Sequence, residues 1–317
     1  MCLAQICRSP INYTGNKYRI LPQFIKYFPR NVNKCIDLFT GGATVAINLI
    51  AEEVVAIDNN PRIINLLEFL KKQDYYKLIN KIDHIIDIYG LSNSYKNGYS
   101  YYKEYVKGNN GLKQYNIEGF NKLKKDYNAL RNKNTNKANL YLYILMVYAF
   151  NNDIRFNSKG EFNLPVGKTD MNKNNREKIK KYIDICKNKE IKFICKDFRK
   201  IDIENFNDVE FVYADPPYLI TDAVYNENAG WGKKEEKDLL NMLDKLDDKG
   251  IKFALSNVLQ KKKLNIRNEI LYNWLEENNN KYFINKIDYN YRSASYNKKN
   301  RDGLEEEILI TNYKLEE

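Results

Sequence analysis

Cysteine and histidine are both scarce in this chain of 317 residues. The five cysteines show neither a CxxC pair nor a spacing to histidine that would suit zinc, and His84 is the only histidine. A metal site and a cysteine–histidine catalytic pair are therefore not expected. So few cysteines in so long a chain also argue against a disulfide framework, and they predict a protein of a reducing compartment.

Long apolar runs are missing as well. The N-terminal residues MCLAQICRSP lack the apolar segment of a signal peptide. The longest apolar stretch, near LYLYILMVYAF, is well short of the ~20 residues that span a bilayer. We therefore predict a cytoplasmic protein without a membrane partner.

Acidic residues are outnumbered by basic ones. The chain has 52 Lys and Arg against 41 Asp and Glu, which gives a formal net charge of +11. Such an excess is typical of proteins that act on nucleic acids, but it also serves solubility alone. Charge by itself leaves both interpretations open.

Five short apolar runs, rich in β-branched residues, predict buried parallel strands: VNKCIDLF, EVVAIDNN, IKFICKDF, VEFVYADPPY and IKFALSN. Helical patterns lie between several of them, which indicates a doubly wound α/β sheet. Near the C-terminus, KYFINKIDYNYR and EEEILITNYK predict a closing antiparallel pair joined by the polar loop SASYNKKNRDG.

The alternation of strands and helices disappears between Phe69 and Met171. We expect a helical insertion there, ending in a loop or hairpin at NNDIRFNSKGEFNLPVGKTD. The absence of a Pro- or Ser-rich linker predicts that the insertion packs on the core. The expected organisation is a first core part at 1–68, an insertion at 69–172 and a second core part at 173–317.

An acid and a glycine pair stand in DLFTGGATVAINL, where the first strand turns into a helix. Glycine lets a backbone approach a ligand closely at the carboxyl edge of an open α/β sheet. The turn is not GxGxxG, so a dinucleotide is not expected, and a NAD-dependent dehydrogenase is the least compatible enzyme class. Asp58, about twenty residues beyond Asp37, suits an acceptor for ribose hydroxyls.

Acids end four of the predicted strands: Asp37, Asp58, Asp197 and Asp215. Aspartates in such places often only cap the following helix. Four of them on one edge of a sheet nevertheless favour a ligand site, and Phe198, after Asp197, has a ring able to cover a purine.

The tetrapeptide DPPY, residues 215–218, suits a task at an exocyclic amine of a nucleobase. Such an amine is a poor nucleophile until two acceptors draw its hydrogens away and aim its lone pair at an electrophilic methyl group. Asp215 and the carbonyl of Pro216 can be those acceptors, because consecutive prolines hold the backbone in place. Tyr218 can then stack on the base.

The sequence resembles the Dam-type DNA adenine-N6 methyltransferases, especially their phage branch. The segments YTGNKYRILPQF, DLFTGGA, IRFNSKGEFNLPVG, FVYADPPYLIT, GIKFALSN and EEILITNY occur in that family's order. The resemblance implies a methyltransferase that uses S-adenosylmethionine (SAM) as methyl donor. Its expected fold is a Rossmann-like α/β sheet with a helical target-recognition insertion that carries a β-hairpin. The order of motifs is that of the α class.

The resemblance also implies roles for single residues. The cofactor positions are Tyr13, Lys17, Asp37, Phe39, Gly41, Gly42, Asp58, Asp197 and Phe198, with Tyr13 and Lys17 also near the target base. The catalytic positions are Asp215, Pro216, Pro217 and Tyr218.

In the hairpin, Arg155 matches an arginine that reads guanine in the major groove, and Pro165 matches a proline that packs on a thymine methyl group. Phe150 and Asn151 match positions near the flipped base. Two residues depart from the family: Asp153 stands where an apolar residue is usual, and Thr169 stands where some phage relatives have a second guanine-reading arginine. The family's GATC target is therefore in doubt, and a related short site is the alternative.

The expected reaction is direct methyl transfer to adenine N6 in duplex DNA, with the base flipped out of the stack. Expected partners are duplex DNA and, in a restriction–modification setting, a companion endonuclease; the expected state is a monomer or a weak dimer on DNA in a bacterial or phage-encoded protein. The same fold acting on cytosine N4 or RNA adenine remains an alternative, as does a DNA-binding relative that has lost catalysis.

Overall fold

The computed structural model describes residues 6–106, 108–220, 231–261, 265–278, 281–287 and 305–314. The chain forms two compact units. The helical unit comprises residues 1–16, 41–48 and 60–193, and the sheet unit comprises residues 17–40, 49–59 and 194–317. The predicted loop SASYNKKNRDG and the last residues of KYFINKIDYNYR lie outside the described residues.

The strands form one sheet in the order β3-β2-β1-β4-β5-β8-β7, with β6 also paired to β5. Pairs β1–β2, β1–β4 and β4–β5 are parallel, whereas β5–β8 and β7–β8 are antiparallel. The predicted α/β fold and the closing antiparallel pair are thereby confirmed. The bounds are Val32–Leu38 (β1), Ala51–Asp58 (β2), Glu190–Cys195 (β3), Phe211–Ala214 (β4), Lys252–Lys261 (β5), Ile266–Arg267 (β6), Phe283–Lys286 (β7) and Glu305–Thr311 (β8).

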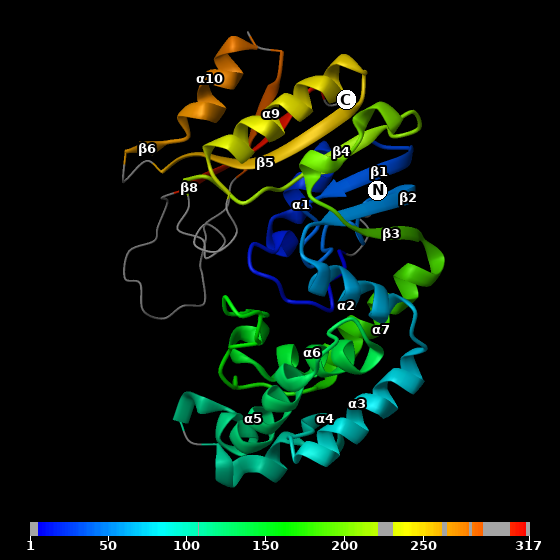
Figure 1. Cartoon of the computed structure of the whole chain (residues 1–317), viewed down its shortest axis with the longest axis vertical. Coiled ribbons are helices and arrows are strands. Elements are labelled where there is room, and N and C mark those ends of the chain that lie inside the picture. The colour runs from blue at the N-terminus through cyan, green and yellow to red at the C-terminus, as the bar shows by residue number, and fades with distance from the viewer. Residues whose placement is uncertain are drawn as a thin grey trace. The chain divides into compact units, whose positions relative to one another are not determined.

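Helices cover both faces of the sheet unit. On one face, α9 (Lys233–Asp248) and α10 (Glu269–Glu277) lie side by side over the sheet (Figure 1) and bury Leu243 and Leu271 against the apolar side chains of β1, β4 and β5. On the other face, two phenylalanine rings pack on Tyr213 of β4. Phe24 is the last residue of α1 (Leu21–Phe24), and Phe28 directly follows η2 (Ile25–Tyr27). Alternate residues of one strand thus serve the two faces, as the strand period requires. This unit also contains the short 3-10 helices η1 (Lys17–Arg19), η6 (Phe198–Lys200) and η7 (Ile203–Asn205).

Strand β3 differs from its prediction. It forms as expected but only Ile191 is fully buried in it, and Ile194 remains 39% exposed. β3 stands at the end of the strand order, so it has a neighbour on one side only. An apolar, β-branched run therefore predicted the strand correctly and its burial wrongly.

The helical unit is built around one buried helix, α6 (Asn136–Tyr148). Every residue from Ala138 to Tyr148 is buried, which is the pattern of a helix enclosed on all sides. It contacts α5 (Lys113–Ala129) and α2 (Pro61–Lys71) (Figure 1). Among the described residues, no helix has both the length and the apolar composition needed to cross a membrane. The remaining elements are α3 (Tyr75–Tyr89), α4 (Ser94–Asn97), η3 (Tyr99–Tyr105), η4 (Gly108–Asn110), η5 (Phe150–Asn152) and α7 (Lys173–Asn188).

The segment after α6 folds back on itself as a hairpin. Isolated antiparallel bridges join Ala149 to Val166 and Phe156 to Phe162. The backbone of Ala149 lies close to Gly167. A β-carbon on residue 167 would meet the Ala149 carbonyl oxygen at 2.2 Å, so only glycine fits at this position. The hairpin expected near residues 151–170 is therefore present.

Candidate active site

The parallel register of the sheet unit brings the predicted acids to one edge. Leu38 at the end of β1 is paired with Ile57 of β2 and Ala214 of β4. Asp58 and Asp215 come next along their strands and therefore flank the same point. The backbone amide of Lys196 donates to the Asp58 carbonyl, which places the end of β3, just before Asp197, beside Asp58.

Asp215 lies in a compact charged cluster with Lys17, Tyr218, Ser256 and Glu307. The Lys17 ammonium is 3.0 Å from Asp215 Oδ1 and 3.1 Å from Glu307 Oε1, and the lysine and glutamate side chains are only 4% and 5% exposed. The Tyr218 hydroxyl lies 3.1 Å from Asp215 Oδ1, 2.9 Å from Glu307 Oε1 and 2.8 Å from Ser256 Oγ. Within the described residues, every contact found for the Asp215 side chain uses Oδ1, so Oδ2 remains as an acceptor.

The protonation of Asp215 is set by this cluster. Burial raises the pKa of Asp215 to about 6, with the Glu307 charge acting in the same direction and Lys17 and the Tyr218 hydroxyl acting against it. The side chain retains 16% of its surface, so the carboxylate is screened but open to one side. It is ionised above about pH 6.

The chain turns sharply after β1. Phe39 has a φ of +67°, in the left-handed region that costs a non-glycine residue roughly 1–2 kcal/mol. In the helical unit, the glycine pair that follows packs against the N-terminal segment. A β-carbon on Gly41 would meet the Tyr13 ring at 2.9 Å, and one on Gly42 would meet the Ile11 carbonyl oxygen at 3.0 Å. The glycines therefore make room for the segment that carries Tyr13.

The remaining predicted acids differ in their surroundings. Asp37 is buried and accepts a hydrogen bond from the Thr40 hydroxyl at 2.6 Å. Asp197 caps η6 and receives Arg199 on both oxygens, and the hydrogen bonds from Arg199 lower the pKa of Asp197. A helix cap was the alternative to a ligand-binding role for the strand-end aspartates, and Asp197 does cap a helix.

Three aromatic rings meet near this edge in the sheet unit. Phe39 lies 5.3 Å from Phe198 and 5.4 Å from Trp231 between ring centroids. The Trp231 indole donates to Glu236, a fully buried carboxylate that also accepts from Asn257 and Asn268. Burial raises the pKa of Glu236, and these three donors act against it. Trp231 was missed by the sequence analysis.

Ser256 and Glu307 were not predicted as site residues either, although the segments GIKFALSN and EEILITNY contain them. A signal for Glu307 exists, because a charged residue directly before the apolar run ILI of a central strand is unusual. No comparable signal marks Ser256, since a serine is unremarkable in a strand.

In the helical unit, the hairpin alternates in burial. Ile154, Phe162, Leu164 and Val166 are buried, whereas Arg155, Asn163 and Pro165 are exposed. The backbone amide and carbonyl of Phe162 are both bonded by the Asn128 side chain of α5, which fixes the hairpin on its unit. Arg155 is oriented by its Nε, which donates to Asn163 Oδ1 at 2.9 Å.

The other predicted hairpin residues have the following positions. Phe150 is 48% exposed. Asn151 has a φ of +58° and its carbonyl accepts from the Asn12 side chain at 2.7 Å. Thr169 accepts a hydrogen bond from Asn152 and is thereby engaged inside the unit.

The Asp153 carboxylate accepts hydrogen bonds from two groups of the helical unit. Oδ2 accepts from the Thr14 hydroxyl at 2.9 Å and Oδ1 accepts from the Ile154 amide at 2.8 Å. Burial raises the pKa of Asp153, while these two donors and Arg155 act in the opposite direction.

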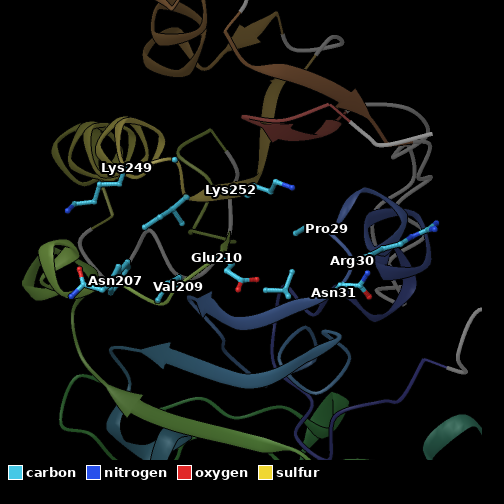
Figure 2. A pocket seen from close by; sticks show the side chains of 12 residues that line it. Pro29, Arg30, Asn31, Asn207, Val209, Glu210, Lys249 and Lys252 are labelled. Carbon is cyan, nitrogen blue, oxygen red and sulfur yellow. The ribbon is translucent and has the colours of Figure 1, made fainter.

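A pocket of about 530 Å³ opens elsewhere on the sheet unit (Figure 2). Its walls come from the residues just before β1, β4 and β5, at the amino ends of these strands, and include Arg30, Glu210 and Lys249. Open α/β sheets bind ligands at the carboxyl ends instead, so this pocket is not part of the candidate site. In the described part of the chain, no group of histidine, cysteine and acidic residues is arranged to hold a metal ion.

Comparison with known proteins identifies the family. A family model described as D12 class N6 adenine-specific DNA methyltransferase matches residues 13–288. The chain belongs to this family. The residues matched run from Tyr13 past DPPY, and membership of this methyltransferase family implies SAM as the methyl donor.

Relatives of the methyltransferase family include much longer proteins. Type II methyltransferase M.FokI of Planomicrobium okeanokoites and modification methylase StsI of Streptococcus sanguinis are each 34% identical over 312 residues, which cover 96% of this chain and 43% of the relative. The DNA adenine methylase of Haemophilus influenzae is 25% identical over 253 residues, 78% of each chain. The chain thus spans less than half the length of the first two.

The donor set at the carboxyl edge fits the methyl donor of this methyltransferase family. A carboxylate at a strand end suits the ribose hydroxyls, and aromatic rings suit an adenine. Asp58 and the Phe39, Phe198 and Trp231 rings supply both kinds of group.

Trp231 offers a direct test of that fit. The chain has two tryptophans, and Trp274 is stacked on Tyr282 and bonded to Asp244. In Trp274→Phe, whose emission comes from Trp231, we expect added SAM or S-adenosylhomocysteine to change the fluorescence; in Trp231→Phe we expect no change. Trp231→Ala should weaken SAM binding by roughly 2- to 10-fold, measured by calorimetry. A ligand-insensitive Trp231 would remove it from the site.

Proposed function

We propose that this protein is a site-specific methyltransferase that transfers a methyl group from SAM to adenine N6 in a short duplex DNA site, GATC or a related one, with the target base flipped. The observation that carries the proposal is Asp215: its Oδ1 is held by Lys17 and Tyr218, and its Oδ2 is left as an acceptor. A carboxylate so held can take one hydrogen of an amine and orient the lone pair.

Several residues would bind the cofactor and the base. Asp58 would accept from the ribose hydroxyls, Phe39 and Phe198 with Trp231 would enclose the adenine of the cofactor, and Tyr13, Lys17, Asp37, Gly41, Gly42 and Asp197 would form the rest of the site. SAM supplies an electrophilic methyl group on a sulfonium. Asp215 and the Pro216 carbonyl then hold the adenine amine, Pro217 keeps that turn rigid, and Tyr218 provides a ring for the base.

We further propose that residues 69–172 form the target-recognition insertion between core parts 1–68 and 173–317. Arg155 would read guanine by its terminal nitrogens, since Asn163 already occupies Nε. Pro165, exposed on the same hairpin, would contact a thymine methyl group, and the exposed Phe150 ring with Asn151 would fill or border the space left by the flipped base. The proposal also includes a companion restriction endonuclease and a cytoplasmic location. The protein would act as a monomer or as a weak dimer on DNA.

The contacts of Asp153 favour a structural role over a role in base recognition, because both of its carboxylate oxygens already accept hydrogen bonds. We expect Asp153→Met to lower the free energy of unfolding by about 1.5–3 kcal/mol and to leave the methylated motif unchanged. Thr14→Val, which removes one of the two donors, should give a smaller loss of the same kind. Both quantities are measured by denaturant unfolding and by sequencing methylated DNA. A motif that shifts towards thymine in Asp153→Met would show instead that Asp153 reads a base.

The proposed function is tested with labelled SAM and four substrates: duplex DNA, single-stranded DNA, RNA and duplex DNA without adenine. We expect transfer to adenine-containing duplex DNA, with N6-methyladenine as the product after digestion and mass spectrometry. Product at cytosine N4 or in RNA would favour the alternative substrates. DNA binding without SAM binding would favour a relative that has lost catalysis. Sequencing the modified DNA then identifies the site.

A further inference from the structure

Glu307 is a buried acid at the centre of the site, and it was not among the site residues predicted from the sequence. It lies on β8, where Leu309, two residues on, is paired with Ser256 of β5, and its side chain is 5% exposed. Oε1 is 3.1 Å from the Lys17 ammonium, 2.9 Å from the Tyr218 hydroxyl and 3.4 Å from Ser256 Oγ. Oε2 is buried, and no hydrogen-bond partner for it exists among the described residues.

Stability alone does not account for this arrangement. Two carboxylates share one ammonium, so the cluster of Lys17, Asp215 and Glu307 carries one excess negative charge in a largely buried place. Burying a charge that is only partly compensated costs several kcal/mol, and apolar replacements of buried ion pairs are often more stable. A buried oxygen without a donor adds to that cost. A role in the reaction explains why the acid is there.

The contacts of Glu307 define that role. Lys17 and the Tyr218 hydroxyl each contact Oδ1 of Asp215 on one side and Oε1 of Glu307 on the other. The Lys17 ammonium can therefore donate to both acids at once. The Tyr218 hydroxyl has one hydrogen, so it lies within reach of both acids and donates to one of them at a time. Without Glu307, Asp215 would be the only acid in contact with the two groups among the described residues.

We propose that Glu307 is a positioning residue for methyl transfer, which keeps Lys17 and Tyr218 on one oxygen of Asp215 and leaves the other oxygen for the adenine amine. This inference rests on the proposed function. Glu307 touches neither substrate nor cofactor in it, and it acts through Lys17 and Tyr218.

The charge of Glu307 also bears on the proton that the reaction releases. When the amine nitrogen bonds to the methyl carbon, the carbon–sulfur bond breaks and the nitrogen becomes cationic. Its N–H bond then breaks, the bonding pair returns to nitrogen, and the proton passes to Asp215 as an O–H bond. A second negative charge beside Asp215 makes this carboxylate a better proton acceptor.

The pH dependence has a defined sign. Asp215 faces Lys17 from η1, Tyr218 from the turn after β4, Glu307 from β8 and Tyr213 from β4, with Asp37 of β1 paired to Tyr213. Activity requires ionised Asp215, so the rate should fall as the pH decreases through about 6, the pKa of Asp215. Glu307 raises this pKa, so removing its charge should move the fall to lower pH.

The experiment is single-turnover methyl transfer by Glu307→Gln across pH 5 to about 8, with excess protein over duplex DNA. We expect the rate at neutral pH to drop at least about tenfold, the dissociation constants for SAM and DNA to stay within about twofold, and the acidic limb to move to lower pH. A merely structural role would not move the limb. Glu307→Asp, which keeps the charge and shortens the side chain, should lose rate with the limb unmoved, and it serves if the glutamine variant fails to fold.

Two controls separate charge from packing. Ser256→Ala removes a hydrogen bond of Tyr218 without a change of charge and should lower the rate with the limb unmoved. Glu269→Gln makes the same chemical change at an exposed acid of α10 paired with Arg267 and should behave as the unchanged protein.

The outcomes are distinguishable. A Glu307→Gln rate within about twofold of the unchanged protein, or an acidic limb that does not move, overturns the inference while the proposed function stands. A wild-type protein that binds SAM and methylates no duplex DNA overturns the proposed function, and the inference with it.

Discussion

Asp215→Ala should lower methyl transfer by roughly 10²–10³-fold or more and leave the fold intact. In the proposed function the carboxylate holds the reacting amine, and this contact would matter most in the transition state, so the loss should appear in the chemical step. The fold should survive because Lys17 and Glu307, 3.1 Å apart, remain as a balanced pair once the third charge is gone. Single-turnover kinetics with labelled SAM measure the rate, and thermal unfolding measures the stability.

The matched control for this change is Asp208→Ala. Asp208 is an acid of the same unit whose side chain is 68% exposed and pairs with Lys34. Its loss should leave the rate within about twofold, since exposed pairs are worth little. DNA affinity should stay close to the wild-type value in both variants. If Asp215→Ala keeps more than about a tenth of the wild-type rate, a difference of ~1.4 kcal/mol, the amine is not held by this residue.

Arg155→Ala should relax one base position of the methylated site. A guanidinium that donates to both guanine O6 and N7 contributes about 1–3 kcal/mol of discrimination, or roughly 5- to 150-fold between guanine and other bases. The Arg155 guanidinium is exposed, and Asn163 orients it by accepting a hydrogen bond from Nε. Its two terminal nitrogens can therefore donate to a base. Methylation rates on a set of duplexes substituted at each position measure the effect.

Lys159→Ala is the comparison for Arg155→Ala. Lys159 is exposed at the tip of the same hairpin and suits a phosphate contact. Its loss should weaken binding similarly for all sequences and reduce the dependence of affinity on salt. An Arg155→Ala protein that weakens all substrates equally, as expected of Lys159→Ala, would mean that Arg155 contacts phosphate rather than a base.

The sheet and the edge that carries Asp58 and Asp215 were predictable from the sequence because they depend on local patterns. Parallel strands align their carboxyl ends wherever they pair, so Asp58 and Asp215 could be placed together without knowledge of any side-chain contact. The prediction for DPPY also uses a local property, because consecutive prolines restrict the backbone whatever surrounds them. The residues alone left a loop or a hairpin open at residues 151–170, and the resemblance to the family implied the hairpin.

The neighbours of each acid were decided only by tertiary structure. Tyr218 and Glu307 are 89 positions apart in the chain, and no periodicity relates them; β8 brings them together by pairing with β5. Asp197 and Asp215 both follow strands, yet one receives an arginine two residues away and the other receives Lys17 from η1.

The sequence by itself therefore determined the strands, the edge and the family of this protein, since these rest on side-chain periodicity, proline geometry and ordered motifs. Which acid is capped, which shares a lysine with Glu307 and which is bonded by Thr14 was decided by packing between distant segments. The charge state and the available oxygen of a carboxylate depend on burial and on donors within about 3 Å, and these exist only once the chain is folded.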